Sequence, residues 1–219
     1  MRKEHSPMPN NTIIFGDSYS TFQDYIPEGY AVYYTPAGRA ETDVTQVEET
    51  WWHQVTTQAG LHLVQNNSWS GSTIGYTGYG NSDCSHSSSF IFRLRQLKEQ
   101  GFFQENEINT VFVFGGTNDS WSDAPLGSSM PENQSEADLF SVLPAISHFL
   151  TDLKETLPAA SIYCLINTEL KPEIGEEMKA ACKRLGIQAI PFTRIAKACG
   201  HPTVRGMEDI ANQVLAVIR

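Results

Sequence analysis

The chain has 219 residues, of which 40% are hydrophobic, and its formal net charge is −10. This length suits one domain of generous size or two cramped ones, and the composition argues against a disordered, fibrous or repeat protein. Nucleic acids and anionic membrane surfaces are poor partners for so acidic a chain, because their phosphates repel it.

Apolar runs alternate with helical patterns along the chain, which is typical of a parallel sheet with helices on both faces. In chain order, the pattern predicts a strand at 12–15, a helix at 49–59, a strand at 61–65, a helix at 90–99, a strand at 110–114, a helix at 137–156, a strand at 161–166, a helix at 172–185, a strand at 187–191 and a helix at 206–218. This order predicts an α/β fold, a flavodoxin-like three-layer sandwich in which helices flank a five-stranded, mostly parallel sheet. We expect residues 1–219 to form one such domain.

Two long segments, at about 23–49 and 71–89, show no clear helical or strand period. The first contains Tyr25, Tyr30, Tyr33 and Tyr34, and the second is rich in glycine, serine and tyrosine. Long loops in compact domains are usually functional or disordered. Because no second core follows either segment, we expect both to border a site rather than to link domains.

Three polar motifs directly follow predicted strands: GDSYS after the first strand, NNSWSGS after the second and GGTND after the third. In doubly wound sheets, ligands bind beyond the carboxyl ends of the strands. The three motifs are therefore expected to converge on one crevice, which makes them the candidate functional site.

Ser18 and His201 are the candidate nucleophile and general base. Ser18 stands three residues after the first predicted strand, at a turn that exposes its side chain and brings main-chain N–H groups near it. His201 is held in a tight loop between Gly200 and Pro202. Each residue alone has an ordinary alternative: Ser18 could only form a turn or cap a helix, and His201 could be a surface histidine.

Gly71 and Asn118 are candidate donors to an oxyanion. Glycine lets a main-chain N–H approach a substrate closely, and the asparagine amide offers a side-chain N–H₂ group. Donors of this kind stabilise the charge that develops as a serine attacks an ester, by about 3–4 kcal/mol each. The alternatives are a bare turn at Gly71 and an Asx-turn at Asn118.

Four blocks of the sequence, taken together, resemble the SGNH (GDSL-type) hydrolase family in order and spacing. They are GDS at 16–18, N-x-x-x-G at 67–71, GTND at 116–119 and HP at 201–202, and the resemblance spans about 13–207. It implies a serine ester hydrolase with Ser18 as nucleophile and His201 as base. It also implies an oxyanion hole formed by the N–H groups of Ser18 and Gly71 and the side chain of Asn118. The motif around Ser18 is not G-x-S-x-G, so the other large serine-esterase fold is disfavoured.

One position departs from the family pattern, because Ala198 stands where the family usually carries Asp, three residues before the histidine. A main-chain carbonyl could hold the second ring nitrogen of His201 instead, and we favour this Ser–His dyad. Asp209 or Glu208 could replace the missing acid only if the start of the last helix bent back. A Cys–His enzyme built on Cys199 is disfavoured, because neighbours in sequence rarely reach the required geometry.

Aromatic residues concentrate near the predicted site, since all four tryptophans and seven of the eight tyrosines precede residue 122. Flat aromatic faces with a polar edge suit sugar rings and acyl chains. We therefore predict a small-molecule ester substrate, a small or carbohydrate O-acyl (acetyl) ester, and expect at least one tyrosine ring of 25–34 beside Ser18. The alternatives are an acyltransferase on the same site and a carbohydrate-binding protein that has lost catalytic rate. The predicted substrate contacts come from Asp17, Tyr34, Trp69 and Trp121.

The sequence indicates no metal, no cofactor and no particular oligomeric state. Asp17, Asp119 and Asp123 lie near the predicted site without the regular spacing of a ligand cluster, and the four cysteines form no C-x-x-C pair. No apolar run precedes Ile13 and no stretch is long enough to span a bilayer, so a cytoplasmic location is expected.

Overall fold

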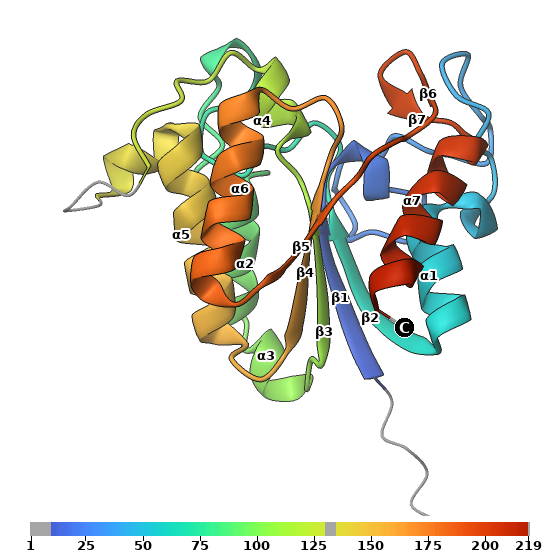
Figure 1. Cartoon of the computed structure of the whole chain (residues 1–219), viewed down its shortest axis with the longest axis horizontal. Helices are drawn as coiled ribbons and strands as arrows, with labels where there is room; N and C mark the ends of the chain where they lie inside the picture. Colours follow the sequence, from blue (N-terminus) through green and yellow to red (C-terminus); the bar gives the residue numbers. More distant parts are fainter. Residues whose placement is uncertain (1–9, 130–134, 219) are drawn as a thin grey trace, which may run out of the picture.

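The computed structural model describes residues 10–129 and 135–218. Five strands form one sheet in the order β2-β1-β3-β4-β5, and each neighbouring pair is parallel (Figure 1). The strands are β1 (Asn10–Gly16), β2 (Leu61–Ser68), β3 (Thr110–Phe114), β4 (Ser161–Ile166) and β5 (Gln188–Pro191). This α/β architecture confirms the predicted fold class, and its strand order is that of a flavodoxin-like sheet.

Helices cover both faces of the sheet (Figure 1). One face packs against α2 (Phe90–Glu99), α5 (Val142–Thr156) and α6 (Pro172–Leu185), and the other against α1 (Trp51–Ala59) and α7 (Val204–Ile218). Local signals set the ends of α1: Thr50 caps it by accepting a hydrogen bond from the N–H of His53, and Gly60 ends it with φ at 64°. Two short helices, α3 (Phe102–Glu105) and α4 (Thr117–Trp121), lie at opposite ends of the sheet.

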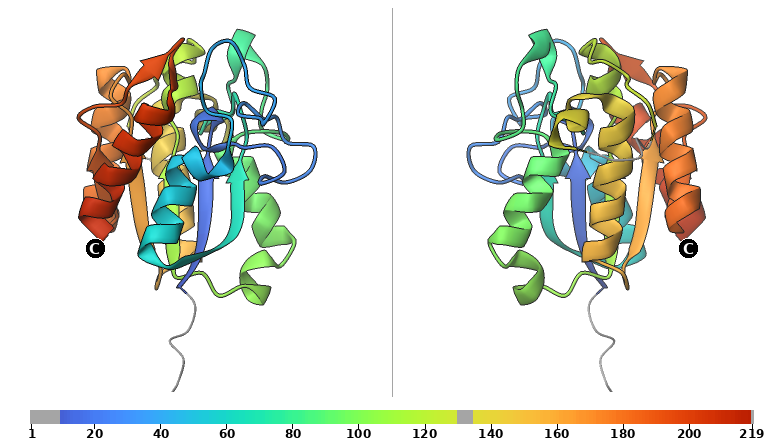
Figure 2. Two further views of the ribbon diagram at one scale, coloured as in Figure 1. Left: turned by 90° about the vertical axis from the view of Figure 1, so that its right-hand side faces the viewer. Right: turned by 90° about the vertical axis from the view of Figure 1, so that its left-hand side faces the viewer.

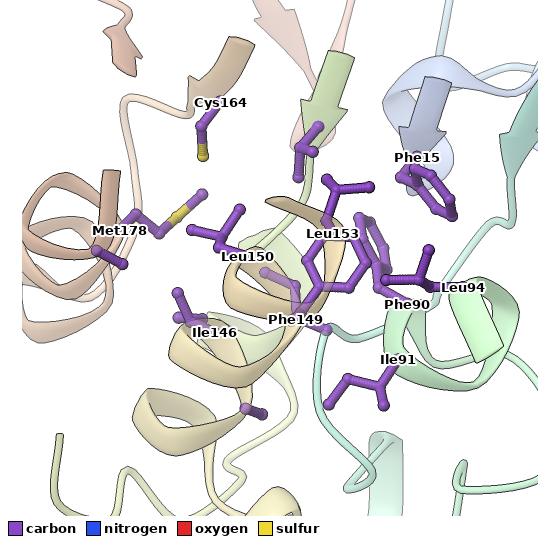
Figure 3. Close-up of a cluster of buried hydrophobic side chains, with 14 of the residues drawn as sticks. Phe15, Phe90, Ile91, Leu94, Ile146, Phe149, Leu150, Leu153, Cys164 and Met178 are labelled. Atoms are coloured by element: carbon purple, nitrogen blue, oxygen red, sulfur yellow. The ribbon is translucent and has the colours of Figure 1, made fainter. Parts of the chain in front are cut away.

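The strands alternate their side chains between two cores. In β3, with the sequence TVFVF, the two valines face the core beneath α2, α5 and α6, whereas the two phenylalanines face the core beneath α1 and α7. In the first core, the ring of Phe149 in α5 contacts the rings of Phe15 and Phe90, at a centroid distance of 5.6 Å from each (Figure 3). Because both faces are covered, such strands form continuous apolar runs in the sequence.

Three predicted helices differ in extent from those observed, and the strands predicted at 12–15, 61–65 and 187–191 span 10–16, 61–68 and 188–191. A 3-10 turn, η2 (Val47–Glu49), precedes α1, so the helix predicted at 49–59 is shorter. The helix predicted at 137–156 is divided into η4 (Glu136–Phe140) and α5, which places Pro144 in a first turn, where its missing N–H is not needed. The last helix begins at Val204, after a hairpin that the sequence pattern did not reveal, β6 (Lys197–Ala198) and β7 (His201–Pro202).

The two long loops contain little regular structure. The first, at 23–49, holds η2 and a bridge between Arg39 and Thr42, and the second, at 71–89, holds η3 (Tyr79–Asn81) and a bridge between Thr77 and Asp83. Together with α4 and the β6–β7 hairpin, they gather around the end of the sheet where the strands finish (Figures 1 and 2). None of the helices in the described part of the chain is both long and apolar enough to cross a bilayer.

Candidate active site

Ser18 lies just beyond the carboxyl end of β1, at the start of the 3-10 turn η1 (Ser18–Ser20). Asp17 caps this turn, because its carboxylate accepts a hydrogen bond from the N–H of Tyr19 at 3.0 Å. The tight turn requires glycine at position 16, since a Cβ on Gly16 would lie 2.6 Å from the Cβ of Ser20. The serine is consequently held close against the end of the sheet.

His201 lies in β7 of the small antiparallel hairpin, opposite Ala198 of β6. Cys199 and Gly200 form the two-residue turn, and their φ angles of 46° and 79° are both positive, as a type I′ turn requires. Nε2 of His201 faces Oγ of Ser18 at 3.1 Å. The fold thus brings a hydroxyl and an imidazole together from positions 183 residues apart.

Hydrogen bonds from two tyrosine hydroxyls hold the hairpin against the rest of the molecule. The hydroxyl of Tyr19 donates to the main-chain oxygen of Gly200, and that of Tyr34 donates to the main-chain oxygen of Pro202 at 3.0 Å. Tyr34 is fully buried. The predicted substrate contact at Tyr34 is therefore wrong, because its ring belongs to the core and its hydroxyl is engaged within the protein.

The second ring nitrogen of His201 faces a main-chain oxygen. Nδ1 lies 3.2 Å from O of Cys199, which confirms the geometry expected of a histidine without an orienting acid. The two acids considered as substitutes are engaged elsewhere, since Glu208 and Asp209 both form ion pairs with Arg205, at 3.1 and 3.6 Å. The hairpin itself therefore supplies the partner of Nδ1.

The surroundings of His201 favour its neutral form. Burial of the ring lowers the pKa of His201 below its ordinary value, and the positive charges of Arg39 and Lys197 lower it further. The Cys199 carbonyl opposes these effects, because it accepts a hydrogen bond from the charged ring. Only a neutral imidazole can accept a proton at Nε2, so the lowered pKa suits a general base.

Asn118 and Gly71 lie on the segments that follow β3 and β2. Nδ2 of Asn118 donates to the main-chain oxygen of Ser72 at 2.9 Å, and its Oδ1 accepts a hydrogen bond from the hydroxyl of Tyr79 at 2.7 Å. Among the described residues, these are the hydrogen bonds of the amide, and they leave its second Nδ2 hydrogen available. Gly71 has φ at 81°, a backbone that favours glycine. Within residues 10–129 and 135–218, no protein oxygen accepts a hydrogen bond from the N–H of Ser18 or Gly71.

A buried group of charges lies beneath these segments. The guanidinium of Arg93, in α2, donates to the main-chain oxygens of Gly16 and Asn67 and so ties the ends of β1 and β2 together. Burial raises the pKa of Asp17 to about 7 and that of Asp119 to about 6, and it lowers that of Arg93 to about 10. Because Asp17 is fully buried, the predicted substrate contact there is wrong, and this carboxyl instead holds the turn that carries the serine.

Trp121 and Trp69 are the other two predicted substrate contacts. Trp121 is 39% exposed, and its ring centroid lies 6.1 Å from that of His201. Trp69 is partly exposed, and its ring centroid lies 4.3 Å from that of Tyr30. The structure therefore places one exposed tryptophan beside the Ser18–His201 pair and stacks the other against loop 23–49.

Three residues of the site were not singled out from the sequence. Tyr33 stacks on His201, with ring centroids 3.7 Å apart, so a tyrosine of 25–34 lies beside the histidine that faces Ser18. Tyr79 lies in loop 71–89 and contacts the amide of Asn118. Arg93 had a recognisable signal, because it interrupts the apolar stripe of α2 with a charge. Among the described residues, no three His, Cys, Asp or Glu side chains cluster as metal ligands.

Comparison with known proteins extends these observations. The model of the family described as GDSL-like Lipase/Acylhydrolase matches residues 10–218. A protein from Bacteroides ovatus described as a GDSL-like lipase is 37% identical, with a TM-score of 0.88 over 96% of this chain and 98% of its own. Its counterpart from Bacteroides uniformis is 40% identical, with a TM-score of 0.88 over 96% and 95%. An acetyl xylan esterase from Butyrivibrio proteoclasticus is 16% identical, with a TM-score of 0.61 over 99% of this chain and 65% of its own. No match is found among curated proteins.

The parallel sheet with polar segments beyond β1, β2 and β3 is the fold of GDSL-like lipases and of carbohydrate esterases. The match to the family model over residues 10–218 and the two relatives that are more than one third identical also identify the family. The chain belongs to the GDSL-like lipase/acylhydrolase family, and the protein is accordingly an ester-hydrolysing enzyme.

Proposed function

We propose that Ser18 is the nucleophile and His201 the general base of this esterase, and that the two work as a dyad on small or carbohydrate O-acyl esters. The proposal rests on the two contacts of the imidazole: Nε2 lies 3.1 Å from Oγ of Ser18, and Nδ1 lies 3.2 Å from O of Cys199. The carbonyl oxygen can only accept a hydrogen bond, so it favours the tautomer protonated on Nδ1. Nε2 is then available to accept the serine proton.

The first half of the reaction forms an acyl-enzyme. Oγ of Ser18 attacks the carbonyl carbon of the ester while its proton passes to Nε2 of His201, and the carbonyl electrons move to oxygen. When the tetrahedral intermediate collapses, the bond to the alcohol breaks and the alcohol leaves with the proton from His201. Water then attacks the acyl-serine by the same route, which releases the acid and restores both residues.

Three donors are available to the oxyanion. They are the N–H groups of Ser18 and Gly71 and the second Nδ2 hydrogen of Asn118. No oxygen of the described residues accepts a hydrogen bond from either N–H group. The bonds of this amide to Ser72 and Tyr79 hold it in one orientation before a substrate arrives. A preorganised donor of this kind lowers the barrier by about 3–4 kcal/mol.

The surroundings of the serine favour a small acyl group. Ser18 is only 4% exposed, so an acetyl group is easier to admit than a long acyl chain. The partly exposed ring of Trp121 beside His201 offers a flat apolar face to a sugar alcohol. A carbohydrate ester also agrees with the acetyl xylan esterase that shares the fold.

Labelling with a fluorophosphonate tests the assignment of the nucleophile. The wild-type enzyme should be labelled at Ser18, and Ser18→Ala should not be labelled. His201→Ala should react more slowly by about 100-fold or more, since it lacks the general base. Ser70→Ala is the matched control, because it removes a nearby serine hydroxyl and should leave labelling unchanged. Full labelling of Ser18→Ala would reject the proposed nucleophile.

Release of acetate from acetylated xylo-oligosaccharides, measured beside hydrolysis of p-nitrophenyl acetate, tests the substrate class. Acetate release from the sugar would support the carbohydrate ester. Rapid hydrolysis of the nitrophenyl ester without acetate release would keep the serine and histidine assignments and reject the sugar.

A further inference from the structure

Tyr33 covers one face of the His201 ring. The two rings stack with their centroids 3.7 Å apart and their planes 5° from parallel. Tyr33 is 8% exposed, and its N–H donates to Oγ1 of Thr21 at 2.9 Å. The carbonyl of the next residue, Tyr34, accepts a hydrogen bond from the N–H of Gln23 at 3.0 Å. The ring that faces the histidine is thus carried on backbone that is anchored on both sides.

Arg39 lies over the same tyrosine ring, with its Cζ 4.3 Å from the ring centroid. A guanidinium and a stacked imidazole cannot share one face of a single ring at these distances, so Arg39 occupies the face opposite to His201. A hydrogen bond to the main-chain oxygen of Tyr33 at 3.4 Å and an ion pair with Glu41 at 3.6 Å hold it there. The three side chains therefore form a layered stack with Tyr33 in the middle.

The hydrogen bonds of His201 leave one motion of its ring weakly restrained. Both contacts lie at ring nitrogens, so they resist movement within the ring plane but only weakly resist displacement of Nε2 perpendicular to that plane. Such a displacement would carry the Nε2 lone pair out of line with Oγ of Ser18. Contact with the flat face of Tyr33 opposes this motion.

We propose that Tyr33, backed by Arg39, positions His201 and compensates for the acid missing at Ala198. The inference rests on the proposed roles of Ser18 and His201. An acid in a triad both orients the imidazole and stabilises its positive charge. The face of Tyr33 orients the imidazole. It also stabilises part of the positive charge of His201, because the π electrons of an aromatic ring attract a cation. The positive charge of Arg39 on the opposite face weakens this stabilisation.

The charges around His201 provide an internal comparison. Arg39 lowers the pKa of His201 and Glu41 raises it, although both belong to the same loop. The titratable and charged groups that face the histidine are Tyr19 of η1, Tyr33, Arg39 and Glu41 of loop 23–49, Lys197 of β6 and Cys199 of the turn. Neutralising one charge of the loop at a time should therefore shift the titration of His201 in opposite directions.

Substitution of Tyr33 tests the positioning role. Tyr33→Leu should lower kcat for p-nitrophenyl acetate by about 10–100-fold and change KM by less than about three-fold, because a base displaced by a fraction of an ångström reacts poorly. Tyr33→Phe keeps the stacked ring and should retain kcat within about two-fold. Tyr25→Leu is the matched control, because Tyr25 lies in the same loop but contacts Trp52. Wild-type kcat in Tyr33→Leu, or equal losses in Tyr33→Leu and Tyr33→Phe, would overturn the proposal.

The charge variants test the stack without requiring turnover. In a Ser18→Ala background, the Cε1 proton of His201 is followed by NMR through a pH titration. Arg39→Gln should raise the pKa of His201 and Glu41→Gln should lower it, each only slightly, since both side chains are exposed and screened. Tyr33→Leu should move the same proton downfield, because the shielding ring is gone. Charge shifts of one sign, or no downfield movement, would overturn the proposal.

The two experiments distinguish failure of the inference from failure of the proposed function. If a fluorophosphonate labels a residue other than Ser18, the proposed function fails, and the NMR titration still decides whether Tyr33 and Arg39 hold the ring. If Ser18 is labelled and Tyr33→Leu turns over at the wild-type rate, only the inference fails.

Discussion

The hydroxyl of Tyr79 donates a hydrogen bond to Oδ1 of Asn118 at 2.7 Å, from a side chain that is 46% exposed. Burial of the hydroxyl, and then the charges of Asp17 and Asp119, raise the pKa of Tyr79 to about 12. The hydroxyl therefore stays protonated and continues to donate through the neutral range. An amide whose oxygen is held in this way keeps its Nδ2 hydrogens turned towards Ser72 and the site.

Removal of the Asn118 amide should affect the transition state more than the bound substrate. Asn118→Ala should lower kcat for p-nitrophenyl acetate by about 10²–10³-fold with little change in KM, because the oxyanion exists only during the reaction. Steady-state kinetics at a pH on the plateau measure both constants. A variant that loses affinity while keeping kcat would show that Asn118 binds the substrate rather than the oxyanion.

Removal of the Tyr79 hydroxyl should have a smaller effect of the same kind. Tyr79→Phe loses one hydrogen bond of about 1 kcal/mol, so kcat should fall by about 5–10-fold. In the double variant with Asn118→Ala, the loss should not grow further, because the hydroxyl acts only through the amide. Additive losses would show that Tyr79 acts on the substrate directly.

The acid limb of the pH–rate profile should lie below the range of an ordinary histidine. His201 must be neutral to accept a proton, so activity is lost as the pH falls through its pKa in the folded enzyme. Burial lowers that pKa, so kcat/KM should be half-maximal below about pH 6.5. Hydrolysis rates in a buffer series measure it, and a midpoint above neutrality would contradict the assignment of His201 as the base.

Restoration of the family's acid should reverse this shift. Ala198 lies directly opposite His201 in the hairpin, and opposed residues of a ladder point their side chains to the same face. Ala198→Asp should therefore raise the pKa of His201, move the acid limb to higher pH and increase kcat on the plateau. Ala198→Asn has the same size without the charge and should leave the limb in place. An acid limb at the same pH in both variants would show that the new carboxylate does not reach the imidazole ring.

The buried carboxyl of Asp17 should make the protein less stable as the pH rises. Burial raises the pKa of Asp17 from 3.8 to about 7, so between these values the folded state binds more protons than the unfolded state. The contribution of Asp17 to the free energy of unfolding must then decrease as the pH increases through this window. Asp17→Asn keeps an oxygen for the N–H of Tyr19 and removes the titration, so its free energy of unfolding should decrease less. Urea unfolding at several pH values in the window measures both slopes, and equal slopes would contradict the shift.

The fold and the position of the site were predictable because the strands and the motifs that follow them are adjacent in the sequence. The run TVFVF is apolar on both faces of β3, and GGTND follows it at once. Two further motifs follow β1 and β2 in the same way, so the parallel sheet brings all three to one end. Strand periodicity and chain order are enough to recover this arrangement.

The orientation of side chains in the aperiodic loop could not be predicted. Tyr33 and Tyr34 are neighbours, yet the first stacks on His201 and the second is buried with its hydroxyl on Pro202. A strand would have assigned alternate residues to opposite faces, but a loop has no such rule. The sequence therefore gives no ground for preferring Tyr33 to Tyr34 as the residue beside the site, and the turn motif at Asp17 does not reveal that its carboxyl is buried.

The β6–β7 hairpin was missed for a different reason. Its strands have two residues each, which is too short to show a period. Its position depends on hydroxyls of Tyr19 and Tyr34, which are 181 and 168 residues from their acceptors in the chain. Only the folded core brings these hydroxyls within hydrogen-bond distance of the hairpin, so no local sequence pattern predicts it.

Ser18 and His201 are attached to the molecule with unequal strength. The serine follows an interior strand of the sheet, whereas the histidine lies in a hairpin held by a two-residue ladder, two tyrosine hydroxyls and the stacked ring of Tyr33. Segments held by few contacts open at a lower free-energy cost than the whole fold. Mild urea should therefore detach the histidine while the sheet is intact, so that inactivation precedes the loss of circular dichroism. At these urea concentrations the sheet is folded but the enzyme is inactive, and dilution of the urea should restore activity without a refolding step.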